Sequence, residues 1–224
     1  MTGFLTKFVS ACLSIITTVA LLFAPVTEGF NLTSNAFAKS FDQVEYGDDR
    51  LVPTEDADGW VFNTDRPLKI VQLTDVHIGG GILSKSFDRK AMNAVAAMLS
   101  YEKPDLVVLT GDNTKPYEDP EETKKLINSL MNIFESRNIP VAVTFGNHDS
   151  EAGPMTRADI MEYYKTFSCV ITAEETDTFK NCATFNIPVL ASDSDDVKFN
   201  VWVFDSGDYD EDEPRHYDRV RTEQ

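Results

Sequence analysis

The sequence predicts an α/β fold built around a largely parallel sheet, and two observations lead to this prediction. Short apolar runs at residues 69–73, 105–109 and 140–145 have the length and composition of buried strands. Between them lie two stretches, 86–102 and 119–134, whose apolar residues recur at helical spacing. This alternating order implies parallel pairing with right-handed crossovers. The 224 residues suffice for one domain with a sizeable core.

The first 38 residues have the features of a secretory signal. A basic residue, Lys7, precedes an apolar run over residues 8–26. The small residues around Phe37 predict cleavage after Ala38, with an earlier cut near Gly29 as an alternative. We therefore expect a protein of the secretory pathway or the extracellular space. An uncleaved membrane anchor at residues 8–26 is the alternative, because the run approaches the shortest length that spans a bilayer.

Two covalent modifications would fit a secretory route. The only glycosylation sequon begins at Asn31, and cleavage after Ala38 would remove it. Cys169 and Cys182 remain as an even pair that could form one disulfide in an oxidising compartment. No Cys-x-x-Cys occurs, so we expect neither a structural zinc site nor a catalytic thiol.

A polar, Asp-rich segment at residues 39–68 leads into the domain, which we place at residues 69–224. Within this segment, the apolar residues 60–62 predict a short edge strand. The glycine run at 79–81 lacks the Gly-Lys-Ser/Thr ending of a phosphate-binding loop, so we interpret it as a mobile connector.

Both helices between the predicted strands have an apolar face. The face of the first consists of Phe87, Ala91, Ala94, Val95, Met98 and Leu99. The second is expected to begin after a capping Asp119, with Pro120 in its first turn. Its buried face consists of Leu126, Ile127, Leu130, Ile133 and Phe134.

The later part of the chain is less regular. A third helix is expected at residues 155–167, with an inward face made of Ile160, Met161 and Tyr164. Residues 183–190 and 198–204 predict strands of a second sheet, and the later strand is apolar on both faces, so we expect both to be covered. The acidic run at 205–213 lacks the spacing of an EF-hand and predicts a solvated loop.

The net charge of −17 limits the classes of partner. Nucleic acids and anionic membrane surfaces favour basic patches, so neither is expected to bind this chain. A phosphate substrate is not excluded, because bound cations dominate the local field of a metal site whatever the distant surface charge.

Metal-capable side chains follow each of the three predicted strands. They are Asp75, His77, Asp112, Asn113, Asn147, His148 and Asp149. The carboxyl ends of parallel strands meet at one edge of a sheet, where α/β proteins place their chemistry. Residues two apart point the same way while a chain stays extended, so Asp75 and His77 are expected to face one ion. The sequence therefore predicts a metal site at this edge.

The three motifs Asp75-Val76-His77, Gly111-Asp112 and Gly146-Asn147-His148-Asp149 resemble those of the calcineurin-like metallophosphoesterases. The Phe-Asp-Ser-Gly-Asp-Tyr sequence at residues 204–209 resembles the motif of one branch of this family. That branch contains plant purple-acid-phosphatase-like proteins and fungal dosage-dependent cell-cycle phosphatases. The resemblance runs from Leu68 to the C-terminus. It implies a four-layer α/β/β/α sandwich and the metal-dependent hydrolysis of phosphate esters.

The resemblance also implies roles for the site residues. Asp75 and His77 would bind one metal ion, and Asp112 would bridge it to a second ion bound by Asn147. The two ions would be Mn, Fe or Zn. His148 would donate a proton to the leaving oxygen, and Asp149 would orient its imidazole.

Two departures from the family pattern qualify this expectation. The tyrosine that gives purple acid phosphatases their colour is absent, because Lys115 stands three residues after Asp112. No Gly-His-x-His occurs, and the only histidine after His148 is His216, which we expect at the surface. We therefore expect the domain to be incomplete at its C-terminus. An inactive relic, or a binding module of the same fold, is the alternative.

Overall fold

The computed structural model describes residues 50–56, 59–81, 84–151, 153–172, 182–210, 212–213 and 215–222. The predicted signal at 1–38, the sequon at Asn31 and the first part of the segment at 39–68 lie outside these ranges. Among the helices that the structure describes, none combines the length and the apolar character needed to cross a membrane.

A three-stranded parallel sheet forms the centre of the molecule. Its strands are β3 (Ile70–Leu73), β5 (Leu106–Thr110) and β7 (Val141–Thr144), in the order β3-β5-β7. Val107 of β5 stands opposite Val71 on one side and Val141 on the other. The predicted strands and their parallel pairing are therefore confirmed.

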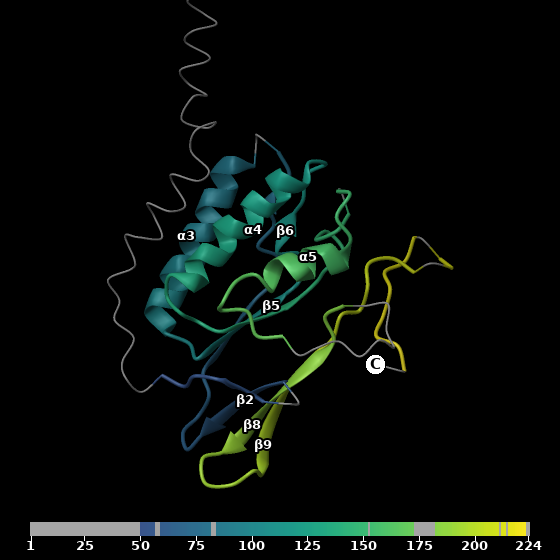
Figure 1. The fold of residues 1–224 in the computed structure, drawn as a ribbon. Coiled ribbons are helices and arrows are strands. Elements are labelled where there is room, and N and C mark those ends of the chain that lie inside the picture. The colour runs from purple at the N-terminus through teal and green to yellow at the C-terminus, as the bar shows by residue number, and fades with distance from the viewer. Residues whose placement is uncertain are drawn as a thin grey trace, which may run out of the picture.

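Two helices connect these strands, α3 (Lys85–Glu102) and α4 (Pro120–Glu135). Figure 1 shows them together with α5 in the upper part of the molecule, near β5. The cap of α4 is confirmed, because the Asp119 carboxylate accepts the Glu121 N–H at 2.9 Å. Its predicted buried face is confirmed as well.

The predicted face of α3 is partly wrong. The helix buries Asp88, Met92, Val95, Ala96 and Leu99. Phe87 is 68% exposed and Met98 is 43% exposed, and Ala94 is exposed too. Contact with the sheet and with α4 selects the stripe that begins at Asp88, whose carboxylate accepts a hydrogen bond from the Ser84 hydroxyl at 3.1 Å.

Helix α5 (Arg157–Tyr164) is shorter than predicted, although its buried residues are Ile160, Met161 and Tyr164 as expected. Thr156 and Asp159 form a capping box that fixes its start. The helix belongs to the same hydrophobic cluster as α3 and α4.

The second sheet has the order β1-β2-β8-β9, with β1 (Thr54–Asp56), β2 (Gly59–Thr64), β8 (Phe185–Ala191) and β9 (Val197–Val203). The predicted strands are confirmed, but β2 lies inside the sheet, not at its edge. One core cluster joins this sheet to the central one. Its buried members are Phe62, Leu106, Val108, Ala142, Ile171, Phe185, Ile187, Val189 and Val203.

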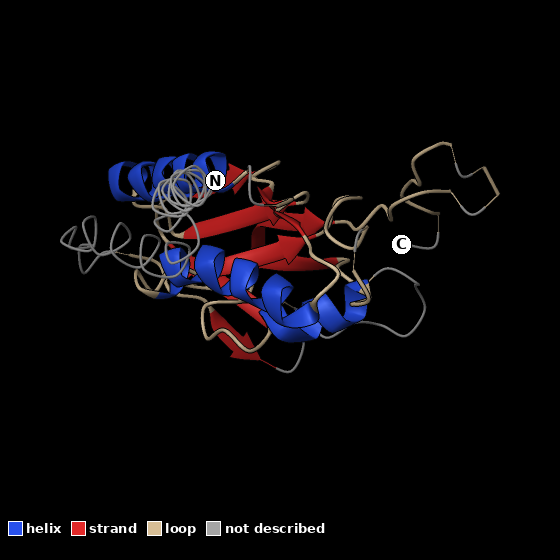
Figure 2. Ribbon diagram, turned by 90° about the horizontal axis from the view of Figure 1, so that it is seen from above, coloured by secondary structure: helices blue, strands red, loops and turns tan. Residues whose placement is uncertain are grey.

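The layers are thus helices, central sheet and second sheet, with β2, β8 and β9 in the lower part of Figure 1. Within the described ranges no helix covers the outer face of the second sheet. The expectation that both faces of β9 are covered is wrong, because Phe199 is 58% exposed and Trp202 is 61% exposed. Figure 2 shows the loops that follow β9 projecting away from the body.

The glycine run after His77 is ordered by pairing, not a mobile connector. Strand β4 (Ile78–Gly79) pairs in parallel with β6 (Thr114–Lys115). A Cβ on Gly79 would lie 2.2 Å from the Lys115 carbonyl oxygen, so only glycine permits this approach.

The predicted disulfide is not formed. Cys169 and Cys182 are both buried, and no disulfide joins them. They belong to the core cluster around the central sheet. Burial raises the pKa of the Cys169 thiol well above its ordinary value, and the neighbouring Glu135 carboxylate raises it further. The thiol is therefore protonated and behaves as a small apolar group.

Candidate metal centre

Asp75 and His77 follow β3, but the chain does not stay extended there. Their φ angles are 55° and 48°, in the left-handed region, so the predicted extended continuation is wrong. The two side chains converge nevertheless, with His77 Nε2 3.4 Å from Asp75 Oδ1. Backbone N–H groups fix this turn, because Asp75 donates to the Gly111 carbonyl and His77 donates to the Asp112 carbonyl.

Asp112 occupies the centre of the site. Its Oδ2 lies 3.5 Å from His77 Nε2, and its Oδ1 accepts the His148 backbone N–H at 2.9 Å. The loop after β7 approaches so closely that a Cβ on Gly146 would lie 2.2 Å from Asp112 Oδ1. A glycine at this position therefore permits the contact between the two strand ends.

The backbone is strained at these residues. In the described chain the non-glycine residues with positive φ are Asp75, His77, Lys103, Asp112 and Asn138. The last of these, and Lys103, follow helices, whereas the other three surround the site. A left-handed conformation costs about 1–2 kcal/mol per residue and persists where the surrounding structure fixes it, typically at functional sites.

Three side chains offer ligand atoms to a single point. Atoms of His77, Asp112 and His148 all lie within 4.8 Å of one another and could hold a metal ion. The two imidazole rings meet edge to face with centroids 5.1 Å apart. Carboxylate and imidazole suit borderline and hard divalent ions. Asp75 stands beside this group through its contact with His77.

Asn147, the fourth expected ligand, is held by a residue far along the chain. Its Nδ2 donates to the Tyr209 hydroxyl at 3.3 Å. The amide oxygen is consequently the atom that remains for a metal ion. Of the expected ligands, the structure thus brings Asp75, His77 and Asp112 together and fixes Asn147 separately.

Asp149 does not orient His148, and this expectation is wrong. Its buried carboxylate accepts N–H groups from Asn113 and Thr114 on Oδ1 and from Gly146 on Oδ2, each at 2.9 Å. It therefore ties the loop after β5 to the loop after β7. Burial raises the pKa of Asp149 to about 6, although hydrogen bonds from Thr114 and Gly146 act in the opposite direction.

The partner of the His148 imidazole is Glu151. His148 Nδ1 is hydrogen-bonded to Glu151 Oε2, and Oε1 of the same carboxylate accepts the Tyr209 hydroxyl at 3.0 Å. These bonds, the one from His148 first, lower the pKa of Glu151. Sequence reasoning missed both Glu151 and Tyr209. The three-residue spacing from His148 is a signal that could have found Glu151, whereas Tyr209 lies 58 residues beyond it.

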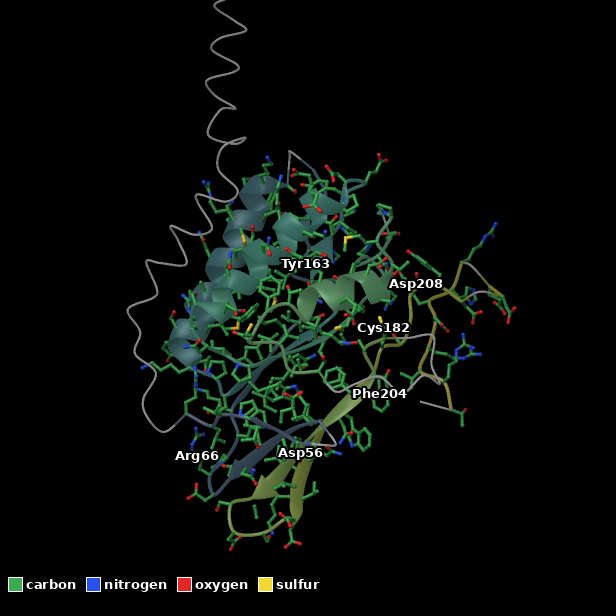
Figure 3. The ribbon with its side chains drawn as sticks, viewed as in Figure 1. Asp56, Arg66, Tyr163, Cys182, Phe204 and Asp208 are labelled. Atoms are coloured by element: carbon green, nitrogen blue, oxygen red, sulfur yellow. The ribbon has the colours of Figure 1, made fainter. Side chains whose placement is uncertain are left out.

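A buried ion pair fixes the loop that carries Tyr209. Arg157 contacts Asp205 at 2.5 Å, and it also donates to the Gly146 carbonyl at 2.8 Å. Asp205 is fully buried, so the prediction of a solvated acidic loop is wrong for this residue. Figure 3 labels Phe204, the residue before Asp205 in the sequence, and Asp208 further along the loop that leaves the second sheet. His216 is exposed as expected, 3.3 Å from Glu213.

Parallel strands whose carboxyl ends carry converging carboxylate and imidazole groups define an α/β protein whose sheet edge could hold a metal ion. Comparison with known families gives the particular class. The model of the calcineurin-like phosphoesterases matches residues 68–223, and the chain belongs to this family.

Curated relatives agree with this assignment. Probable inactive purple acid phosphatase 29 of Arabidopsis thaliana is 26% identical over 66% of this chain and 42% of its own length. Probable inactive purple acid phosphatase 14 of the same plant is 31% identical over 46% of this chain and 28% of its own length. Phosphatase DCR2 of Saccharomyces cerevisiae is 34% identical over 42% and 18% respectively. The chain thus spans less than half the length of each of these relatives.

Proposed function

We propose that the chain carries the metal-binding part of a phosphoesterase that hydrolyses phosphate esters at two metal ions. The observation that supports this most is the convergence of His77, Asp112 and His148 at the ends of neighbouring parallel strands. The strained backbone at His77 and Asp112 adds support, because such strain is typical of functional sites.

The residues present fit a metal ion of the Mn, Fe or Zn type. Asp75, His77 and Asp112 would hold one ion, and Asp112 with the amide oxygen of Asn147 would contribute to a second. When bound, such ions supply positive charge that stabilises phosphoryl oxygens and lowers the pKa of a bound water.

The chain's own residues then position the reacting groups. The hydrogen bond from His148 Nδ1 to Glu151 leaves Nε2 facing the ester, and when the ring is protonated on both nitrogens, Nε2–H would donate its proton to the leaving oxygen. Asp149 acts through the backbone, since its three N–H contacts hold the loops that carry Asp112 and Asn147. Arg157 supports the same loop from the other side through the Gly146 carbonyl.

A second candidate function is a non-catalytic module that binds a single ion. In the described part of the chain, the second ion would have only Asp112 and Asn147, which are few ligands for a two-metal clamp. His216, the only later histidine, is exposed. Several relatives carry the word inactive in their names, which also favours the non-catalytic module.

For partners and location we retain the sequence-based proposals. The substrate would be a phosphate ester, and the net charge of −17 disfavours nucleic acid. Cleavage of the signal would leave a secreted protein without stable membrane association.

Titration of the purified chain with Mn²⁺, combined with hydrolysis of p-nitrophenyl phosphate, tests the proposal. Asp112→Asn should lower the rate of hydrolysis by at least about a hundredfold, since the Asp112 carboxylate would contact both metal ions. Asp195→Asn, in the exposed loop between β8 and β9, should leave it unchanged. Equal effects of the two substitutions would contradict the site assignment. Retained binding of one ion without turnover would select the non-catalytic module.

A further inference from the structure

The Tyr209 hydroxyl is hydrogen-bonded to two side chains beside the candidate metal centre, Asn147 and Glu151. Tyr209 lies in the loop after β9, yet its hydroxyl contacts Asn147 at 3.3 Å and Glu151 at 3.0 Å. Both partners lie in the segment that follows β7, 62 and 58 residues earlier in the chain. A single hydroxyl thus joins the second sheet's loop to the segment that carries His148.

The direction of each hydrogen bond follows from the groups involved. An ionised carboxylate only accepts, so the one hydrogen of the Tyr209 hydroxyl goes to Glu151. The hydroxyl oxygen must then accept from Asn147, which places the amide nitrogen Nδ2 on the tyrosine.

This arrangement decides which atom of Asn147 can meet a cation. A side-chain amide presents an oxygen on one side and a nitrogen on the other, and only the oxygen is a ligand. Because Tyr209 binds the nitrogen, the oxygen is the amide atom that remains for a cation. Among the described residues, the Tyr209 hydroxyl is the partner that distinguishes the two orientations of this amide.

The same hydroxyl restrains His148 through Glu151. One oxygen of the carboxylate binds Tyr209 and the other binds His148 Nδ1. A proton on Nδ1 leaves Nε2 as the free nitrogen of the neutral ring, and the ring cannot turn over without breaking this contact. Hydrogen bonds from residues that do not themselves contact the metal commonly orient the side chains of a metal site.

Tyr209 is itself held in place from several directions. Its backbone N–H donates to the Asp208 carboxylate, and its ring stacks on that of Tyr217 with centroids 5.6 Å apart. The buried pair between Arg157 and Asp205 fixes the same loop. The hydroxyl therefore has a defined position from which to orient its partners.

We infer that Tyr209 is a positioning residue of the metal centre, which sets the amide of Asn147 directly and the ring of His148 through Glu151. The inference rests on the proposed function for the presence of a metal ion. The orientation of the two side chains can be measured without one.

The test compares Tyr209→Phe with Tyr217→Phe in the full chain. Each substitution removes one hydroxyl from the same ring stack, but only the first removes the contacts with Asn147 and Glu151. The first readout is NMR of the metal-free protein, using the side-chain amide of Asn147 and the ring nitrogens of His148. The second is the Mn²⁺ affinity, and thermal unfolding checks that both variants fold.

We expect Tyr209→Phe to abolish the protection of the Asn147 amide protons and to weaken Mn²⁺ binding about tenfold, as loss of an outer contact typically does. Tyr217→Phe should change neither. An unchanged Asn147 amide signal in Tyr209→Phe would overturn the inference, and so would a changed signal with unaltered Mn²⁺ affinity. If the unsubstituted chain binds no Mn²⁺, the proposed function fails, and the amide and ring signals alone decide the role of Tyr209.

Discussion

The central sheet and the second sheet are both rich in apolar residues, but they differ in how these residues are covered. Every residue of β7 is buried, whereas β9 exposes Val197, Phe199 and Trp202. The parallel strands are joined by helices that pack on one face while the second sheet packs on the other. Apolar composition alone therefore does not establish burial, because connections determine which faces are covered.

The two regions are joined by charge as well as by apolar contact. Arg157 and Asp205 connect α5 to the loop after β9. Arg66, which follows β2, pairs with buried Asp105 at the start of β5 at 2.7 Å. Substitutions in these two ion pairs and in each sheet test how the central sheet and the second sheet differ in stability.

The largest effect is expected from Asp205→Ala. It would leave the Arg157 guanidinium, whose side chain is 13% exposed, buried without its partner. Breaking such a pair should lower the free energy of unfolding by about 3–5 kcal/mol. Urea denaturation measures this, with Asp195→Ala in the exposed loop as the control. Equal stability of the two variants would mean that the pair does not hold the regions together.

A smaller but still large difference is expected between apolar truncations in the two sheets. Leu109→Ala in β5 removes a fully buried side chain and should cost about 2–5 kcal/mol. Phe199→Ala in β9, where the side chain is 58% exposed, should change stability by less than about 0.5 kcal/mol. A comparable loss from Phe199→Ala in thermal unfolding would show that β9 is covered in solution.

The smallest effect concerns pH. Burial opposes ionisation of Asp105, but hydrogen bonds from Arg66, Lys69 and Leu51 outweigh it and lower the pKa of this carboxyl. A lowered pKa in the folded state stabilises the fold above the unfolded value of about 3.9, and this contribution is lost as the pH falls through the folded pKa.

Asp105→Asn should therefore be less stable than the unsubstituted chain at pH 7, and the difference should shrink at pH 3. Arg66 is partly exposed, so solvent screening keeps the effect modest. Unfolding by urea at the two pH values measures it, with Asp195→Asn as the control. A difference that does not depend on pH would exclude the ionised carboxylate as its source.

The strands of the central sheet, their parallel pairing and the types of ligand at their ends could all be predicted from the sequence. These features depend on local properties: apolar runs of strand length, glycine at the turns and a capping Asp119 that is recognisable from its neighbours. Asp75, His77 and Asp112 could be placed in one site because parallel strands end at one edge.

The pairing of the side chains around this site depends on tertiary contacts that no local pattern predicts. The Asp149 carboxylate accepts backbone N–H groups, and Glu151 is the hydrogen-bond partner of His148 instead. Tyr209, which contacts Asn147, lies in a loop 62 residues further along the chain. Which direction a side chain points in an irregular loop, and which distant segment packs against it, depend on the whole chain and not on any local pattern. The exposure of β9 could not be predicted from its sequence either, because exposure depends on which segments pack over a strand and not on the strand's own residues.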